Sequence, residues 1–115
     1  MSFQDAAGAA TNRHQLSFYT TCSATVLSGT VQANLGSNTL QSLKAAYAYQ
    51  DNNFGISVNG STTLKDIDGT VPLTIGYATI GKWDYGAGTS LNGHLNSISY
   101  FNYRFSDTQL QAATA

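Results

Sequence analysis

The residues best suited to chemistry in this chain are Trp83, Asp84 and Tyr85, which adjoin one another in the glycine-bearing stretch KWDYGAGTS at 82–90. Sugar sites combine an aromatic side chain, which covers the apolar face of the ring, with carboxylate or amide oxygens that accept hydrogen bonds from hydroxyls. We therefore predict a carbohydrate-binding site formed by Trp83, Asp84, Tyr85 and Asn92. The alternative is that Trp83 packs over the end of the fold as a lid, with Tyr85 at its rim.

A second group of polar residues consists of Asp66 and Asp68, with Asp51 as a third carboxylate that the fold could bring near them. Such a group could bind Ca²⁺, which takes about six to eight oxygen ligands. However, Asp68-Gly69 is also a typical turn pair, because both residue types favour turn conformations. We favour the turn and predict no metal site.

The remaining nucleophile and base candidates are Cys22, His14 and His94. A single cysteine cannot form an intrachain disulfide, and Cys22 is best read as a small buried apolar residue in a strand. A nucleophilic thiol would need a general base beside it, and nothing in the sequence pairs Cys22 with either histidine. His94 is interpreted as a packing and hydrogen-bonding residue. We therefore predict no catalytic residue and no cofactor.

The composition limits the classes of function. The 115 residues correspond to one domain, the formal net charge is −1, and only 10% of the residues are charged. Because basic residues are few and scattered, we expect neither nucleic-acid binding nor attraction to anionic lipid. Residues 1–15 lack the features of a secretory signal, and no apolar run is long enough to span a membrane. The polar residues are mainly Ser, Thr, Asn, Gln and Gly, which suits a secreted or particle-surface β protein.

The elements that must position these residues are predicted to be mostly strands. Alternation of apolar and polar residues is the main signal, and Asn59-Gly60 is the strongest hairpin turn. The stretch 42–50 also has good helix propensity, but Leu43, Ala45, Tyr47 and Tyr49 alternate, so we predict a strand there. Residues 1–12 are predicted to be an entry arm with room for a short strand around Phe3. The other predicted strands lie within 13–20, 24–27, 30–35, 54–58, 61–66 and 73–80.

The C-terminal segment carries the clearest local signals. Leu95 to Tyr103 is rich in β-branched and aromatic residues and predicts a strand. Ser106-Asp107-Thr108-Gln109 fits a capping box, so a helix is predicted from Asp107 to about Thr114. Because a helix of this length is marginal alone, we expect Leu110 to anchor it by packing. Arg104 is expected to stack on a neighbouring aromatic ring or to cap the helix region.

This C-terminal segment resembles the closing segment of the concanavalin A-like lectin/glucanase superfamily, especially the laminin-G-like modules of phage structural and tail proteins. The resemblance implies an all-β antiparallel sandwich of the jelly-roll type over residues 13–115, with one short C-terminal helix. Many relatives have a charged pair where this chain has Asn96 and Ser97, so no carboxylate role is expected there. The matching positions are Leu91, Gly93, Leu95, Ile98, Tyr100, Phe101, Tyr103, Arg104, Phe105, Ser106, Asp107, Gln109 and Leu110.

The fold alone does not define a function, because it hosts lectins, enzymes, adhesins and structural proteins. Glucanases of this superfamily use glutamates, whereas this chain contains none, so we expect no enzymatic activity. We predict a non-enzymatic structural or decoration component of a phage-like virion. The alternative is a carbohydrate-binding lectin module of a tail fibre or of an extracellular bacterial adhesin.

The expected partners follow from strands that the sequence lacks. Complete relatives carry strands ahead of residue 13 that are not found here, so sheet edges would be left open for pairing. We expect other virion subunits, in a homo-oligomer or lattice, to cover them, and a host surface glycan as a further ligand. The expected location is the virion surface, after assembly in a host cytoplasm that disfavours disulfides, or alternatively the extracellular space.

Overall fold

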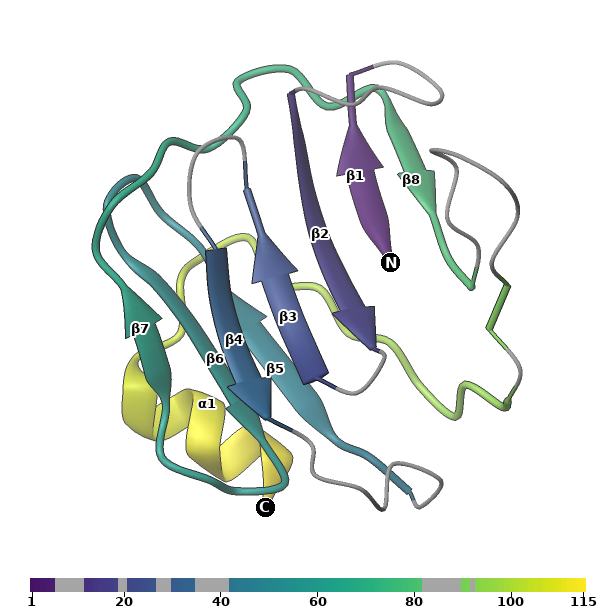
Figure 1. The fold of residues 1–115 in the computed structure, drawn as a ribbon, viewed down its shortest axis with the longest axis vertical. Coiled ribbons are helices and arrows are strands. Elements are labelled where there is room, and N and C mark those ends of the chain that lie inside the picture. Colours follow the sequence, from purple (N-terminus) through teal and green to yellow (C-terminus); the bar gives the residue numbers. More distant parts are fainter. Residues whose placement is uncertain (6–11, 19–20, 27–29, 35–41, 82–89, 92) are drawn as a thin grey trace.

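The chain folds into two antiparallel β-sheets and one C-terminal helix (Figure 1). This is a computed structural model, and it describes residues 1–5, 12–18, 21–26, 30–34, 42–81, 90–91 and 93–115. The all-β class and the antiparallel pairing predicted from the sequence are confirmed for the described residues.

The larger sheet has five strands in the order β4-β3-β2-β1-β8. Its strands are β1 (Ser2–Gln4), β2 (Arg13–Phe18), β3 (Thr21–Thr25), β4 (Thr30–Asn34) and β8 (Tyr77–Thr79). The short strand expected around Phe3 is present as β1, which lies between β2 and β8 and pairs with both. The predicted hairpin after residue 24 is confirmed by the pairing of β3 with β4, in which Thr25 opposes Thr30.

The smaller sheet has three strands in the order β5-β6-β7. They are β5 (Ala45–Ala48), β6 (Phe54–Val58) and β7 (Leu64–Asp66). The strand predicted from the alternation in 42–50 is confirmed as β5. Pairing of β5 with β6 outweighs the helix propensity of these residues. Asn59 and Gly60 have φ angles of 49° and 72°, as a primed hairpin turn requires.

Strand β6 lies at the centre of the fold, because both of its faces are buried. Phe54, Ile56 and Val58 point toward the five-stranded sheet and pack with Ala24 and Val26 in the hydrophobic core. The opposite face carries Gly55 and Ser57 and lies against helix α1 (Asp107–Thr114). A Cβ atom at Gly55 would lie 3.1–3.3 Å from side-chain atoms of Thr63, Arg104 and Leu110, so a larger residue would require these side chains to shift by a few tenths of an ångström.

Helix α1 begins and ends as the sequence predicts. Ser106 accepts a hydrogen bond from the Gln109 amide at 3.3 Å, and the Gln109 side chain accepts one from the Ser106 amide at 2.8 Å. Leu110 is 1% exposed and anchors the helix on the three-stranded sheet. At the last turn, Thr114 Oγ1 accepts a hydrogen bond from the Gly60 amide and lies 3.0 Å from Ser57 Oγ. The capping box, the helix bounds and the role of Leu110 are thus confirmed.

The predicted strand at 95–103 is wrong for this structure. The segment passes from Gly93 to helix α1 without joining either sheet, and no hydrogen bond between described residues holds the backbone of 94–103. The predicted strand at 73–80 is also too long, since only Tyr77–Thr79 pairs as β8. The physical reason is the same in both places: β-propensity favours an extended chain, but a strand also needs a neighbouring edge with free donors and acceptors.

Candidate functional site

The residues of the predicted carbohydrate site, Trp83, Asp84, Tyr85 and Asn92, lie outside the described residues. The residues that flank it are described. The Leu91 amide donates a hydrogen bond to the Gly81 carbonyl at 2.7 Å, and Gly81 has a φ of 74°. The chain therefore enters and leaves the stretch 82–90 at one place, beyond the end of β8.

A shallow hollow of about 340 Å³ opens at the ends of β5 and of the 70–73 segment. Its described lining is Tyr49, Gln50, Asp51, Val71, Pro72 and Leu73. The set contains an aromatic ring, an amide and a carboxylate, which are the groups that sugar sites use. However, Asp51 Oδ1 already accepts a hydrogen bond from the Val71 amide at 2.7 Å, so this carboxylate oxygen also fixes the loop that forms the far wall.

Sequence reasoning missed this hollow. It considered Asp51 only as a calcium ligand and Tyr49 only as part of a strand. The adjacency of an aromatic, an amide and an acidic residue just before a turn was the available signal. The opposite wall comes from residues about twenty positions later, and only the tertiary structure brings them there.

Two of the aspartates considered as calcium ligands accept hydrogen bonds from backbone amides. Asp66 Oδ1 accepts a hydrogen bond from the Asp68 amide at 2.9 Å. The backbone amide of Gly69, which has a φ of 133°, donates a hydrogen bond to the side-chain oxygen of Asn52. The Gly69 carbonyl in turn accepts a hydrogen bond from the backbone amide of Asn52. Within the described part of the chain, no three His, Cys or Asp side chains come together as a metal site would require. The chain has neither a turn nor a bend at residues 67–70, so the predicted turn at Asp68-Gly69 is not found, and the Asp68 amide instead bonds to the Asp66 side chain.

A cluster of rings is centred on the buried His14 and includes the partly buried Phe3, Tyr47 and Tyr49. His14 is 3% exposed, stacks on Phe3 at 4.8 Å between ring centroids, and lies 4.2 Å from Tyr49 and 6.3 Å from Tyr47. Burial lowers the pKa of His14 to about 4, so its imidazole is neutral at pH 7. His14 thus packs as one ring among others.

The tyrosines of this cluster are held in their neutral forms. Burial, and secondarily Tyr49, raises the pKa of Tyr47 far above its ordinary value. Burial and a hydrogen bond with Tyr100 raise the pKa of Tyr49 to about 12. The Tyr47 hydroxyl is buried without a hydrogen-bond partner among the described residues. The cluster contains no charged group at neutral pH, so it serves packing between the sheets rather than proton transfer.

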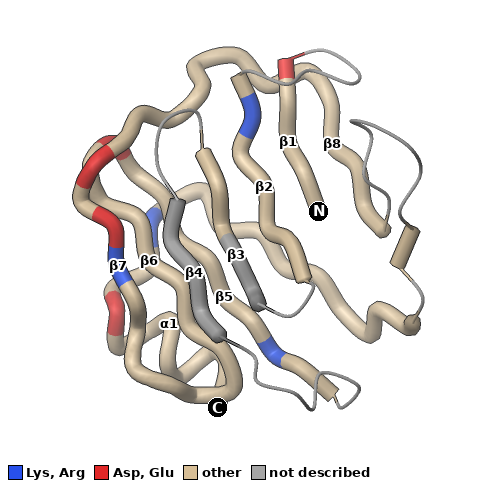
Figure 2. The backbone as a smooth tube through the Cα atoms, viewed as in Figure 1, with Lys and Arg blue, Asp and Glu red and all other residues tan. Residues whose placement is uncertain are grey.

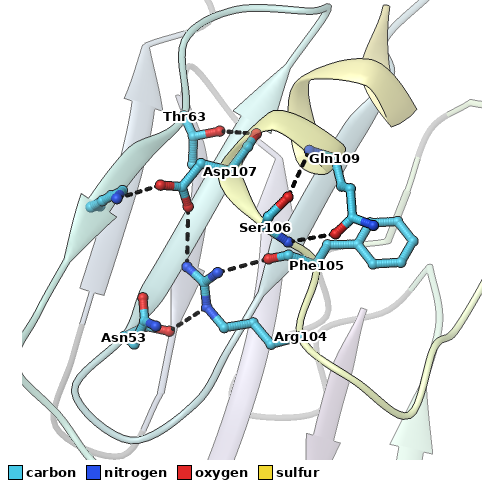
Figure 3. A network of polar contacts seen from close by, with 8 residues as sticks. Asn53, Thr63, Arg104, Phe105, Ser106, Asp107 and Gln109 are labelled. Carbon is cyan, nitrogen blue, oxygen red and sulfur yellow. Dashed lines mark hydrogen bonds and ion pairs between the residues drawn. The ribbon is translucent and has the colours of Figure 1, made fainter.

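The most connected polar side chain is Arg104, which joins the start of helix α1 to β6 (Figure 3). Its Nε donates to the Asn53 carbonyl at 3.1 Å, and one terminal nitrogen donates to the Phe105 carbonyl at 2.7 Å. The other terminal nitrogen lies 3.3 Å from Asp107 Oδ1. The side chain is 14% exposed. The expectation that Arg104 serves the helix region is confirmed, although it acts through backbone carbonyls and a carboxylate.

Asp107 is the second member of this network. It forms an ion pair with Lys65 on β7, and its backbone carbonyl accepts a hydrogen bond from Thr63 Oγ1 at 2.9 Å. Hydrogen bonds from Lys65 and Arg104 lower the pKa of its carboxyl group. Because these charges are satisfied by one another, the Arg104–Asp107 network holds the helix to the sheet and presents no free group to a ligand.

Comparison with known proteins identifies no relative: no family model, curated protein or solved structure matches the chain. In the described residues, no helix has the length and apolar character needed to cross a bilayer.

Proposed function

We propose that this chain is a non-enzymatic β-sandwich of the jelly-roll, concanavalin A-like type that serves as a structural or decorating subunit of a phage-like particle. Its site of action is the virion surface, and its partners are further subunits of that assembly. The resemblance of the C-terminal segment to laminin-G-like phage modules supports the particle context. The absence of glutamate from the sequence supports a non-enzymatic role.

The single observation that carries the assembly role is the exposure of many large apolar side chains in one part of the sequence. Ten of the thirteen large hydrophobic side chains that are exposed in the described structure lie between Leu73 and Tyr103. No Lys, Arg or Asp occurs in 69–81 or in 93–103. In Figure 2 the charged residues gather mostly around β6, β7 and the start of α1, and none lies on β8. Exposed apolar regions of this extent mark interaction surfaces.

Sedimentation velocity over a wide concentration range tests this proposal. We expect species larger than the 12.2 kDa chain, and electron microscopy of concentrated samples should show rings, filaments or sheets of regular repeat. A chain that sediments as a 12.2 kDa monomer at the highest concentration would contradict the subunit role.

A second candidate function is glycan binding, and the hollow beside Tyr49 and Asp51 favours it together with the Trp83-Asp84-Tyr85 stretch. Glycan-array screening and titration followed by NMR would test it. Loss of glycan binding in Trp83→Ala with an unchanged melting temperature supports the binding site. A large drop in melting temperature supports the alternative in which Trp83 is a packing lid.

A further inference from the structure

The segment Leu95–Tyr103 has the side chains of a strand and contacts Phe3 and Tyr49 through Tyr100, but among the described residues it pairs with no neighbouring strand. Its five large hydrophobic residues are all between 43% and 66% exposed, namely Leu95, Ile98, Tyr100, Phe101 and Tyr103. No hydrogen bond between described residues uses its backbone donors or acceptors. An extended stretch with these features is suited to pair with the edge of another sheet.

The edge of β8 offers the complementary half of such a contact. β8 is the last strand of its sheet in the described structure, and it pairs only with β1. The hydrogen bonding between this strand and β1 continues one residue before Tyr77, because the Gly76 amide donates to the Gln4 carbonyl at 2.9 Å. By contrast, β7 at the edge of the smaller sheet carries Lys65 and Asp66, and charges of this kind discourage pairing. Among the described residues, the β8 strand carries no such charge.

The occupant that fits best is a second copy of this chain. Each copy carries both an unpaired strand-like segment and an open sheet edge. The two regions contain no Lys, Arg or Asp, so the surface offers no charge complementarity to an acidic or basic partner. A net charge of −1 gives only weak repulsion between copies.

We propose that residues 95–103 of one copy form a strand against the β8 edge of a second copy. This inference rests on the proposed function, since it specifies the contact that joins the subunits. Because the donor segment and the acceptor edge are different surfaces, the contact is heterologous and can repeat from copy to copy. Such a contact suits a ring or a lattice.

Hydrogen–deuterium exchange of the full chain at low and high concentration tests the pairing without any substitution. We expect the amides of 95–103, and those amides of Tyr77–Thr79 that do not point toward β1, to exchange rapidly in dilute solution and to become protected together as oligomers form. Protection of 95–103 already in the dilute monomer would overturn the proposal, because the segment would then pair within its own chain. Protection confined to one of the two regions would overturn it as well.

A matched pair of variants tests the same contact by sedimentation. Ile98→Lys places a charge in the proposed interface, whereas Ile67→Lys makes the same change at an exposed site beside Asp66. We expect Ile98→Lys to weaken association by about tenfold or more and Ile67→Lys to leave it unchanged. Circular dichroism in dilute solution checks that both variants fold.

The outcomes separate this inference from the proposed function. Oligomers that persist in Ile98→Lys, without exchange protection in the two regions, would overturn the strand contact while the subunit role stands. A wild-type chain that is monomeric at every concentration would overturn both.

Discussion

Two regions of this molecule have similar strand-forming sequences and different fates. Residues 54–58 become the fully buried strand β6, with one sheet on one face and helix α1 on the other. Residues 95–103 also carry several aromatic and β-branched side chains, yet they join no sheet among the described residues and remain exposed. The difference is in the neighbours, because β6 is paired on both edges and the later segment on neither.

The comparison shows how a strand is stabilised. Side-chain propensity contributes a fraction of a kcal/mol per residue, whereas burial of apolar surface and satisfaction of backbone groups supply most of the stability. β6 gains both, whereas the apolar side chains of 95–103 are only partly buried and its backbone forms no hydrogen bond with other described residues. The buried region therefore determines the stability of the monomer, and the exposed region is available for association.

The sharpest test of this contrast compares two phenylalanines. Phe54 is 1% exposed in the core, so Phe54→Ala should lower the free energy of unfolding by about 3–5 kcal/mol. Phe101→Ala removes the same atoms from a half-exposed site and should change monomer stability by less than about 1 kcal/mol. Urea unfolding at low concentration measures both. Equal losses in the two variants would mean that 95–103 contributes to the core of the monomer.

Acid should weaken the buried region through His14. Its pKa in the folded state, about 4, lies below the ordinary value of 6.5, so the unfolded chain binds the proton more tightly. The contribution of His14 to stability is therefore complete above pH 6.5 and is lost as the pH falls toward 4, by about 3 kcal/mol in all.

Unfolding titrations at several pH values measure this loss. His14→Phe keeps a ring of similar shape against Phe3 and Tyr49 and should flatten the dependence between pH 6.5 and 4. An unchanged slope in the variant would assign the acid sensitivity to other groups, such as the paired carboxylate of Asp107.

The Arg104 contacts predict a smaller effect. Arg104→Leu removes hydrogen bonds to the Asn53 and Phe105 carbonyls and the contact with Asp107, so unfolding should become easier by about 2 kcal/mol. Lys65→Leu removes one half-exposed partner of the same carboxylate and should cost less than about 1 kcal/mol. Thermal unfolding of both variants checks the order, and a larger loss in Lys65→Leu would contradict it.

The smallest predicted effect concerns the helix cap. Ser106→Ala removes the hydroxyl that accepts the Gln109 amide and should destabilise the protein by about 1 kcal/mol. Ser97→Ala, in the exposed segment, serves as the control and should have no measurable effect. A shift in melting temperature for Ser97→Ala equal to that of Ser106→Ala would show that the two segments are equally ordered.

The sequence predicts the local features well because their causes lie within a few residues. The Ser106–Gln109 capping box needs only a spacing of three, and the Asn59-Gly60 turn needs only residues that tolerate positive φ. Alternation in 42–50 was likewise enough to identify β5. The candidate carbohydrate site remains a prediction, since Trp83, Asp84, Tyr85 and Asn92 are outside the described residues.

By itself, the sequence determined where the chain turns, where helix α1 begins and which stretches favour an extended backbone, because these properties depend on neighbouring residues. Only the tertiary structure decided which extended stretches become strands. It paired β1 between β2 and β8, brought Arg104 to the Asn53 carbonyl and left 95–103 exposed. A strand pairs only with the edge of another strand, which a distant part of the chain or another molecule must supply. The residues within a segment do not determine whether such an edge lies beside it.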